Sequence, residues 1–226
     1  MASIDNWLAR QLPDMQKSMT PLSGVDVLHI SNDQSLKKMR PRIGFRQMKV
    51  EDRTIPRICA ASTLLGCIYG HTGVHYMAMD RFVDDGKSTW NGVFAVYRIP
   101  VESVIRPSKK LVPDAPQTGE VWVVPYEPSL YEINPIRIGA MFLHDVLERA
   151  TNGQKIINNT IFLKVDQPFA LEKDKIAPGF YAFDLPGDLT AYGGNPMEKV
   201  VNLRTISASE WKDALTKLRA EAMKRD

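Results

Sequence analysis

Short apolar runs, separated by turn residues and not by helices, constrain the fold of this chain more than any other feature. They are rich in β-branched and aromatic residues, as strands are, and they occur at 25–30, 57–61, 92–99, 120–124, 136–142, 160–165, 179–185 and 200–206. No helical pattern alternates regularly with them, as it would in a parallel βαβ sheet. The sequence therefore predicts an α+β fold with mostly antiparallel, strongly twisted sheets and a few short helices.

Two short helices are expected in the N-terminal half. Residues 4–18 have an amphipathic pattern that Ser3 can cap, and Pro13 is a point where this helix can split. Directly after the second strand run, Ser62 is expected to cap a helix that closes near Gly70. A strand that leads straight into a capped helix is a common frame for a site, because helix N-terminal amides bind anions.

The clearest helical pattern lies at 207–224. Ser207 and Glu210 have the spacing of a capping box, and apolar residues recur along one face, which predicts an amphipathic C-terminal helix. One run is ambiguous: 136–142 is typical of a strand, but the letters MFLHDVLERA also suit a helix that ends near Gly153.

The 226 residues suggest one domain with an extension, or two small domains. We expect an N-terminal helical arm over 1–23, an α+β core over 24–143, and a C-terminal extension over 144–226 that packs on the core. The composition, 44% hydrophobic and 24% charged, is that of a globular protein. No apolar run reaches the length of a membrane span, and the N-terminus has no secretory signal pattern. Cys59 and Cys67 have neither zinc-knuckle nor redox-pair spacing, so we expect a reduced, cytoplasmic protein.

Charge is concentrated in one segment of the chain. Residues 37–57 hold eight basic and two acidic residues, a net charge of +6, whereas the whole chain has +3. Such a run attracts phosphates, so nucleic acid is a possible partner, although a solvated loop is an equally ordinary interpretation. The candidate phosphate or nucleic-acid contacts are Lys37, Lys38, Arg40, Arg42 and Arg46.

Two residues stand where strands begin or end and carry side chains suited to chemistry. His29 lies at the end of the first strand run, where its ring can reach a ligand; a satisfied or surface histidine is the plainer alternative. Glu120 opens a strand after a Thr-Gly turn, where a carboxylate can stabilise a cationic transition state or orient a ribose hydroxyl. A solvated glutamate is the alternative there. Tyr69 and Tyr76 are candidates for stacking on a planar ring, or for packing at the rim of the core.

A metal site is not expected. His71 and His75 are four residues apart, but Gly70 and Gly73 weaken a helix there, and no third ligand is evident nearby. The motifs of nucleotide hydrolases, Rossmann enzymes, serine hydrolases, zincins and EF-hands are also missing from the sequence.

The order of these features over residues 24–143 resembles the ADP-ribosyltransferase fold of the H-Y-E type, in its rifampin-modifying and RNA 2′-phosphotransferase-like branches. The features that match are the strand with His29, the Ser62-Thr63 junction, a tyrosine on the next helix, and Glu120 at a later strand start. One departure is Ile30-Ser31 after the histidine, where these enzymes commonly have Gly-Thr.

The resemblance implies NAD as cofactor. In such families the histidine binds the adenosine-side ribose, a tyrosine stacks against nicotinamide, and the acidic residue supports cleavage of the glycosidic bond. Glu120 is then the expected catalytic residue. The expected cofactor-binding residues are His29, Ser31, Arg57, Ser62, Tyr69 and Tyr76.

Three functions remain open from the sequence. The first is an enzyme that cleaves NAD or transfers ADP-ribose. The second is a non-catalytic interaction protein, a phage-encoded one among the possibilities, that docks in a larger assembly through amphipathic segments at its two ends. The third is an RNA-binding protein that uses residues 37–57, although this segment has only Phe45 to stack on bases.

Overall fold

A computed structural model describes the chain except for residues 1–2, 44–51, 71–91, 150–154, 186–199 and 223–226. Within the described part, ten strands form one largely antiparallel sheet in the order β1-β5-β6-β3-β2-β4-β7-β8-β11-β12, and β9 pairs with β10. The α+β class predicted from the sequence is therefore confirmed. The strands are β1 (Met19–Ser23), β2 (Leu28–Ser31), β3 (Ile58–Ala61), β4 (Val93–Arg98), β5 (Ser103–Pro107), β6 (Glu120–Val123), β7 (Ile136–Arg149), β8 (Lys155–Val165), β9 (Phe169–Ala170), β10 (Lys175–Ile176), β11 (Gly179–Leu185) and β12 (Val201–Thr205).

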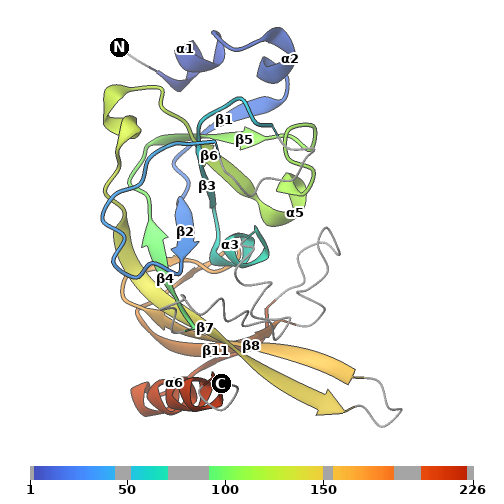
Figure 1. Ribbon diagram of the computed structural model, residues 1–226, viewed down its shortest axis with the longest axis vertical. Coiled ribbons are helices and arrows are strands. Elements are labelled where there is room, and N and C mark those ends of the chain that lie inside the picture. The colour runs from blue at the N-terminus through green and yellow to red at the C-terminus, as the bar shows by residue number, and fades with distance from the viewer. Residues whose placement is uncertain (1–2, 44–51, 71–91, 150–154, 186–199, 223–226) are drawn as a thin grey trace. The chain divides into compact units, whose positions relative to one another are not determined.

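In the part of the chain that the structure describes, helices are few, and all but one are short. They are α1 (Ile4–Leu8), α2 (Pro13–Gln16), α3 (Leu64–Gly70), α5 (Ala115–Thr118) and α6 (Ala208–Ala222), with a 3-10 turn η1 at Pro128–Tyr131 (Figure 1).

The described residues group into two compact units, each built from segments far apart in the chain. Unit 1 takes its residues from Met1–His29, Ser35–Gly70 and Tyr97–Arg137, and unit 2 from Ile30–Gln34, His71–Val96 and Ile138–Asp226. The predicted boundaries at 23/24 and 143/144 divide the chain along its length, whereas the units reflect long-range strand pairing.

Unit 1 buries both faces of its strands. Ile58, Ala60, Val121 and Val123 point to one core cluster, together with residues such as Val104. Trp122 and Val124 point to a second cluster, which Ile4, Met19, Ile55, Ile105, Val112 and Ala115 complete. The period-two alternation of a strand produces this division. Between the two clusters, β3 and β6 pair in register from Ile58↔Val123 to Ala61↔Glu120.

The N-terminal arm is only partly helical. Ser3 caps α1 as expected, since its side chain accepts a hydrogen bond from the Asn6 amide at 3.2 Å. Pro13 is the first residue of α2, where a missing amide hydrogen costs no helical bond, so the proline does divide the predicted helix. Residues 19–23 then pair with β5 as an edge strand, which the sequence pattern did not predict.

The helix after β3 begins one residue later than expected. Thr63, not Ser62, caps α3: its hydroxyl accepts a hydrogen bond from the Gly66 amide at 3.1 Å, and its carbonyl accepts one from the Cys67 amide at 3.2 Å. Gly66 allows α3 to approach α5 closely, because a Cβ there would lie 2.2 Å from the Thr118 carbonyl oxygen. Close packing of α3 thus fixes the turn that leads into β6.

Unit 2 is built on the long ribbon of β7 and β8, which pair from Gly139↔Val165 to Arg149↔Lys155 (Figure 1). The ambiguous run at 141–150 is therefore strand and not helix as far as Arg149. β8 also pairs with β11, so the two predicted strands at 160–165 and 179–185 are neighbours.

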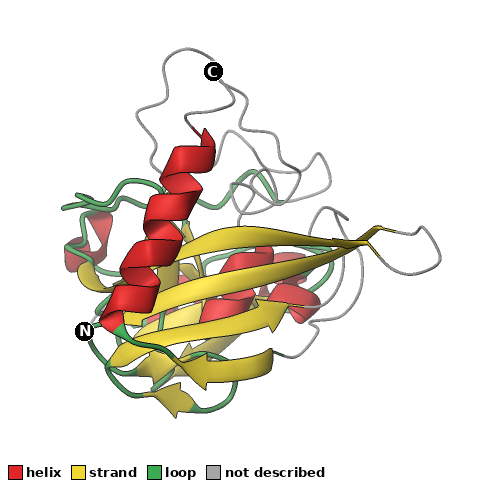
Figure 2. Ribbon diagram, turned by 90° about the horizontal axis from the view of Figure 1, so that it is seen from below, coloured by secondary structure: helices red, strands yellow, loops and turns green. Residues whose placement is uncertain are grey.

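α6 lies across strands of unit 2 (Figure 2). Leu218 packs with Val93, Ala140 and Phe142, and the Trp211 ring stands edge-on to Phe142 with centroids 5.5 Å apart. At its start, the Ser207 amide donates to Glu210 Oε2 at 2.8 Å and the Glu210 amide donates to Ser207 Oγ at 3.1 Å. These two bonds form the reciprocal pattern of a capping box.

Candidate functional site

Glu120 lies at the start of β6 with its carboxylate held by the chain itself. The indole Nε1 of Trp122 donates a hydrogen bond of 2.6 Å to Glu120 Oε1. The two residues are two apart in a strand, so their side chains share a face. Trp122 is fully buried while Glu120 is half-buried, so the carboxylate is anchored from the core and stays at the surface.

Arg57 packs against the face of the Trp122 ring and so supports the bond between Trp122 and Glu120. Its guanidinium carbon lies 4.0 Å from the centroid of the Trp122 ring, within cation–π distance. Its Nη1 donates to the Asp52 carbonyl at 3.0 Å, to the Ile55 carbonyl at 3.2 Å and to Asp52 Oδ2 at 3.3 Å. The Arg57 side chain is fully buried. The structure thus places this expected cofactor-binding residue inside the core, where it contacts protein groups.

Asp52 is itself fixed by the chain that follows it. Its carboxylate accepts hydrogen bonds from the Thr54 hydroxyl at 2.7 Å, the Ile55 amide at 3.0 Å and the Thr54 amide at 3.2 Å. These donors satisfy the Asp52 carboxylate and hold it in place beside the buried Arg57 guanidinium.

His29 lies on β2, which neighbours β3 on the side opposite β6. Its Nδ1 lies 3.1 Å from the carbonyl oxygen of Cys59. A carbonyl oxygen only accepts hydrogen bonds, so Nδ1 carries the hydrogen, and in the neutral ring Nε2 is then an acceptor. Desolvation is the largest effect on the ring and lowers the pKa of His29 below its ordinary value. The histidine is therefore suited to accept a hydrogen bond from a ligand hydroxyl.

The register limits how His29 and Glu120 meet. Ala61 pairs with Glu120 on one side and with Leu28 on the other, so these three side chains share a face. His29, one residue after Leu28, then projects to the opposite face. What the two candidate residues share is their common neighbour, Cys59 of β3.

Cys59 pairs directly with Trp122 across the β3–β6 ladder. The residue is exposed, yet burial of the thiol is the largest cause of its raised pKa. The Glu120 carboxylate raises this pKa further, and the Arg57 guanidinium lowers it. The thiol therefore lies within electrostatic reach of both charges. Cys67 is buried and its Sγ donates to the Leu28 carbonyl at 3.2 Å.

The other four expected cofactor residues lie in different places. Ser62 lies near the strand start, since a Cβ on Gly119 would lie 4.0 Å from its Oγ. Tyr69 is half-buried on α3. Ser31 belongs to unit 2, where its Oγ accepts a hydrogen bond from the Asp33 amide at 3.1 Å. Tyr76 lies outside the described residues.

The basic segment is partly neutralised by one acid. Lys38 and Arg40 both form ion pairs with Glu132, and the Arg40 Nε donates to Glu132 Oε2 at 2.9 Å. Hydrogen bonds from these two side chains lower the pKa of Glu132. Met39 lies between them, is buried, and pairs with Ile133. Lys37 and Arg42 are exposed, and Arg46 lies outside the described residues.

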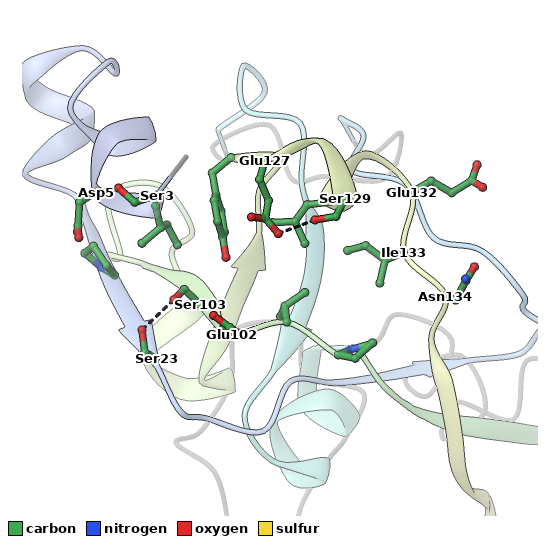
Figure 3. A pocket seen from close by; sticks show the side chains of 16 residues that line it. Ser3, Asp5, Ser23, Glu102, Ser103, Glu127, Ser129, Glu132, Ile133 and Asn134 are labelled. Atoms are coloured by element: carbon green, nitrogen blue, oxygen red, sulfur yellow. Dashed lines mark hydrogen bonds between the residues drawn. The ribbon is translucent and has the colours of Figure 1, made fainter. Parts of the chain in front are cut away.

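A hollow of about 650 Å³ opens elsewhere in unit 1 (Figure 3). Glu102, Glu127 and Asp5 line it, and Glu132 at its rim points away from them. No lysine, arginine or histidine belongs to its lining, which also includes Ser3, Ser23, Ser103, Ser129, Tyr126 and Asn134. Burial and then the Glu127 and Glu102 carboxylates raise the pKa of the Tyr126 phenol. The hollow suits a cation and would repel a phosphate.

Of the residues that hold Glu120 in place, Trp122 and Asp52 were not assigned to the site from the sequence, and Arg57 was named only as a cofactor-binding residue. Trp122 follows the pattern Glu-x-Trp in a strand, which alone indicates that the two side chains share a face. Asp52 and Arg57 are linked to Trp122 only through tertiary packing. Their contribution therefore had no signal in the sequence beyond a short Asp-to-Arg spacing.

Neither a metal centre nor a membrane helix is found in the described part of the chain. There, no three His, Cys, Asp or Glu residues gather in a way that could hold a metal ion, and His71 and His75 lie outside it. Likewise, no described helix has both the length and the apolar character needed to cross a bilayer. Comparisons with protein-family models, with curated proteins and with solved structures found no match to this chain.

Proposed function

We propose that this chain binds NAD and cleaves its bond to nicotinamide, transferring ADP-ribose to an acceptor or to water. The observation that carries the proposal is the half-buried carboxylate of Glu120, which the buried Trp122 indole anchors at 2.6 Å. A carboxylate held in place by a buried donor provides the negative charge that stabilises a ribose as nicotinamide leaves. His29 projects to the opposite face of the sheet and takes no part in this stabilisation.

The reaction would run as follows at the ribose carbon next to nicotinamide. The C1′–N bond breaks and its electron pair goes to the pyridinium nitrogen, so nicotinamide leaves neutral. The sugar becomes an oxocarbenium ion, whose positive charge the Glu120 carboxylate stabilises. Water or an acceptor hydroxyl then adds to C1′ and loses its proton to solvent.

Nicotinamide release tests this proposal directly. Purified protein is incubated with NAD and free nicotinamide is measured by chromatography, for wild type, E120Q and E127Q. We expect release from wild type and from E127Q, and a loss of about 100-fold or more in E120Q. E127Q is the matched control, because Glu127 lines the acidic hollow instead. No release and no thermal stabilisation by millimolar NAD would refute the proposal.

The acidic hollow favours a second candidate function, an interaction protein that receives a basic group of its partner. The hollow has a volume typical of ligand sites, about 650 Å³, and its carboxylates are spread around the lining. That spread suits an extended ammonium or guanidinium group. An oligolysine peptide should bind wild type and lose affinity in the E102Q/E127Q variant. D213N, on the exposed face of α6, is the control that should bind as wild type does.

A further inference from the structure

The Glu120 carboxylate is held by a buried network and not by its own strand position alone. Trp122 Nε1 donates to Glu120 Oε1 at 2.6 Å, and the Trp122 ring is fully buried among core side chains that include Ile55 and Ile105. A buried indole has no room to rotate, so the direction of its N–H bond is fixed by packing. The carboxylate oxygen that accepts this bond is fixed with it.

Arg57 acts on the same indole from its face. The guanidinium lies 4.0 Å above the ring and is tied to Asp52 and to the Ile55 carbonyl. A cation over the ring draws electron density from the π system, which makes the indole N–H a stronger donor. Asp52, Arg57, Trp122 and Glu120 therefore form one connected chain from the core to the surface.

We infer that Trp122 is a positioning residue for the Glu120 carboxylate, with Arg57 as the support that holds and polarises the indole. The inference rests on the proposed function only in naming the reaction that the Glu120 carboxylate serves. When the indole N–H is lost, the carboxylate leaves its place beside Cys59, even where the fold survives.

Cys59 is a natural reporter for the position of that charge. It pairs with Trp122, is exposed, and has a thiol whose pKa responds to the Glu120 carboxylate. Its alkylation rate by iodoacetamide, followed by peptide mass spectrometry from about pH 7 to 9.5, measures the thiolate fraction. Buried Cys67 is the internal reference for unfolding.

We expect E120Q to raise the Cys59 alkylation rate, because it removes a negative charge that disfavours the thiolate. The rise should be roughly threefold, the change in thiolate fraction that half a pKa unit gives below the pKa. W122F should shift the rate in the same direction. W7F is the matched control, since Trp7 packs against the same core cluster, and it should react as wild type does. A W122F profile equal to that of wild type would overturn the inference.

A second measurement needs no change at Trp122, whose burial makes W122F a demanding substitution. In the ¹H–¹⁵N spectrum, the Trp122 indole resonance should move with pH as the bonded carboxylate titrates. E120Q should abolish that movement and leave the other indole resonances unchanged. A Trp122 indole resonance that moves with pH in E120Q as it does in wild type would also overturn the inference.

Activity separates this inference from the proposed function. If wild type releases nicotinamide, W122F should lower kcat about tenfold and leave the KM for NAD within about twofold, as expected for a misplaced catalytic group. An unchanged kcat would contradict the positioning role. If wild type releases none, the proposed function fails, and the Cys59 and indole measurements still decide whether Trp122 positions the carboxylate.

Discussion

His29 makes a pH dependence predictable at the scale of one residue. Desolvation lowers the folded-state pKa of its ring below the ordinary value of 6.5, so the unfolded chain binds a proton more tightly than the folded chain. The stability that follows is fully present above pH 6.5 and is lost as the pH falls through the folded pKa. Urea unfolding between about pH 5 and 8 should therefore show wild type losing stability below about pH 6.5 more steeply than H29Q.

At about pH 8 the H29Q variant should be less stable than wild type by about 1 kcal/mol, the typical net contribution of one hydrogen bond, here that to the Cys59 carbonyl. Parallel profiles of stability against pH for wild type and H29Q would contradict this prediction, because they would mean that the His29 ring titrates alike in the folded and the unfolded chain.

Arg57 carries a prediction about stability. Its guanidinium and the Asp52 carboxylate are 0% and 5% exposed, so removing one partner leaves the other as a buried charge without its ionic partner. R57M should lower the free energy of unfolding by about 3–5 kcal/mol, and D52N/R57M should recover part of it. R40M is the control: Arg40 is exposed and pairs with Glu132 in water, so its urea transition should stay near that of wild type. A wild-type transition for R57M would contradict this account.

At the scale of elements, the approach of α3 to α5 depends on Gly66. A Cβ at that position would lie 2.2 Å from the Thr118 carbonyl oxygen and 3.0 Å from the Ala61 Cβ. Since backbone cannot give way cheaply, G66A should cost about 3 kcal/mol, despite the higher helix propensity of alanine. Thermal unfolding measures this loss. The matched control is G70A in the same helix, whose Cβ would meet Thr118 at an ordinary 3.8 Å, and it should unfold near wild type.

Elements with strong local patterns were predictable and those defined by their partners were not. The runs that became β4, β6 and β11 were found within a residue of their ends, because their apolar residues fix them locally. β1 and β5 were not predicted, because each contains a proline, which lowers its strand propensity. The antiparallel pairing between the two strands stabilises them despite the prolines. β1 tolerates Pro21 because it is the edge strand of the sheet.

The candidate site divides in the same way. Glu120 opens β6 as expected, because a polar residue after a Thr-Gly turn marks a strand start in the sequence. His29 was expected at the end of its strand, whereas it is the second residue of β2. The functional roles of both residues stay predictions. The Thr63 cap was misplaced by one residue, since Ser62 and Thr63 are both good N-caps and only the α3 backbone decides between them. Trp122, Arg57 and Asp52 meet only after β6 pairs with β3 and the chain before β3 folds under it. Periodicity does not record such contacts.

At the scale of the whole molecule, the distribution of charge decides between partners. Residues 37–57 carry +6, which leaves −3 for the remainder of the chain. In the folded chain Glu132, from outside the segment, engages Lys38 and Arg40, and Arg57 is buried against Asp52. The number of basic residues in this segment therefore overstates the positive potential that an approaching nucleic acid would meet.

This predicts weak RNA binding by wild type with a shallow salt dependence. Eight phosphate contacts to a single strand would give a slope of log affinity against log salt near −5.6, at about −0.7 per contact. Fluorescence anisotropy with a single-stranded RNA from about 50 to 200 mM salt should give a slope no steeper than about −3.5, the value for the five basic residues other than Lys38, Arg40 and Arg57. E132Q, which releases Lys38 and Arg40, should bind more tightly and steepen the slope by about −1.4, and E127Q should leave it unchanged. A wild-type slope near −5.6 would instead favour RNA binding through residues 37–57, because only an open row of basic side chains releases that many counterions.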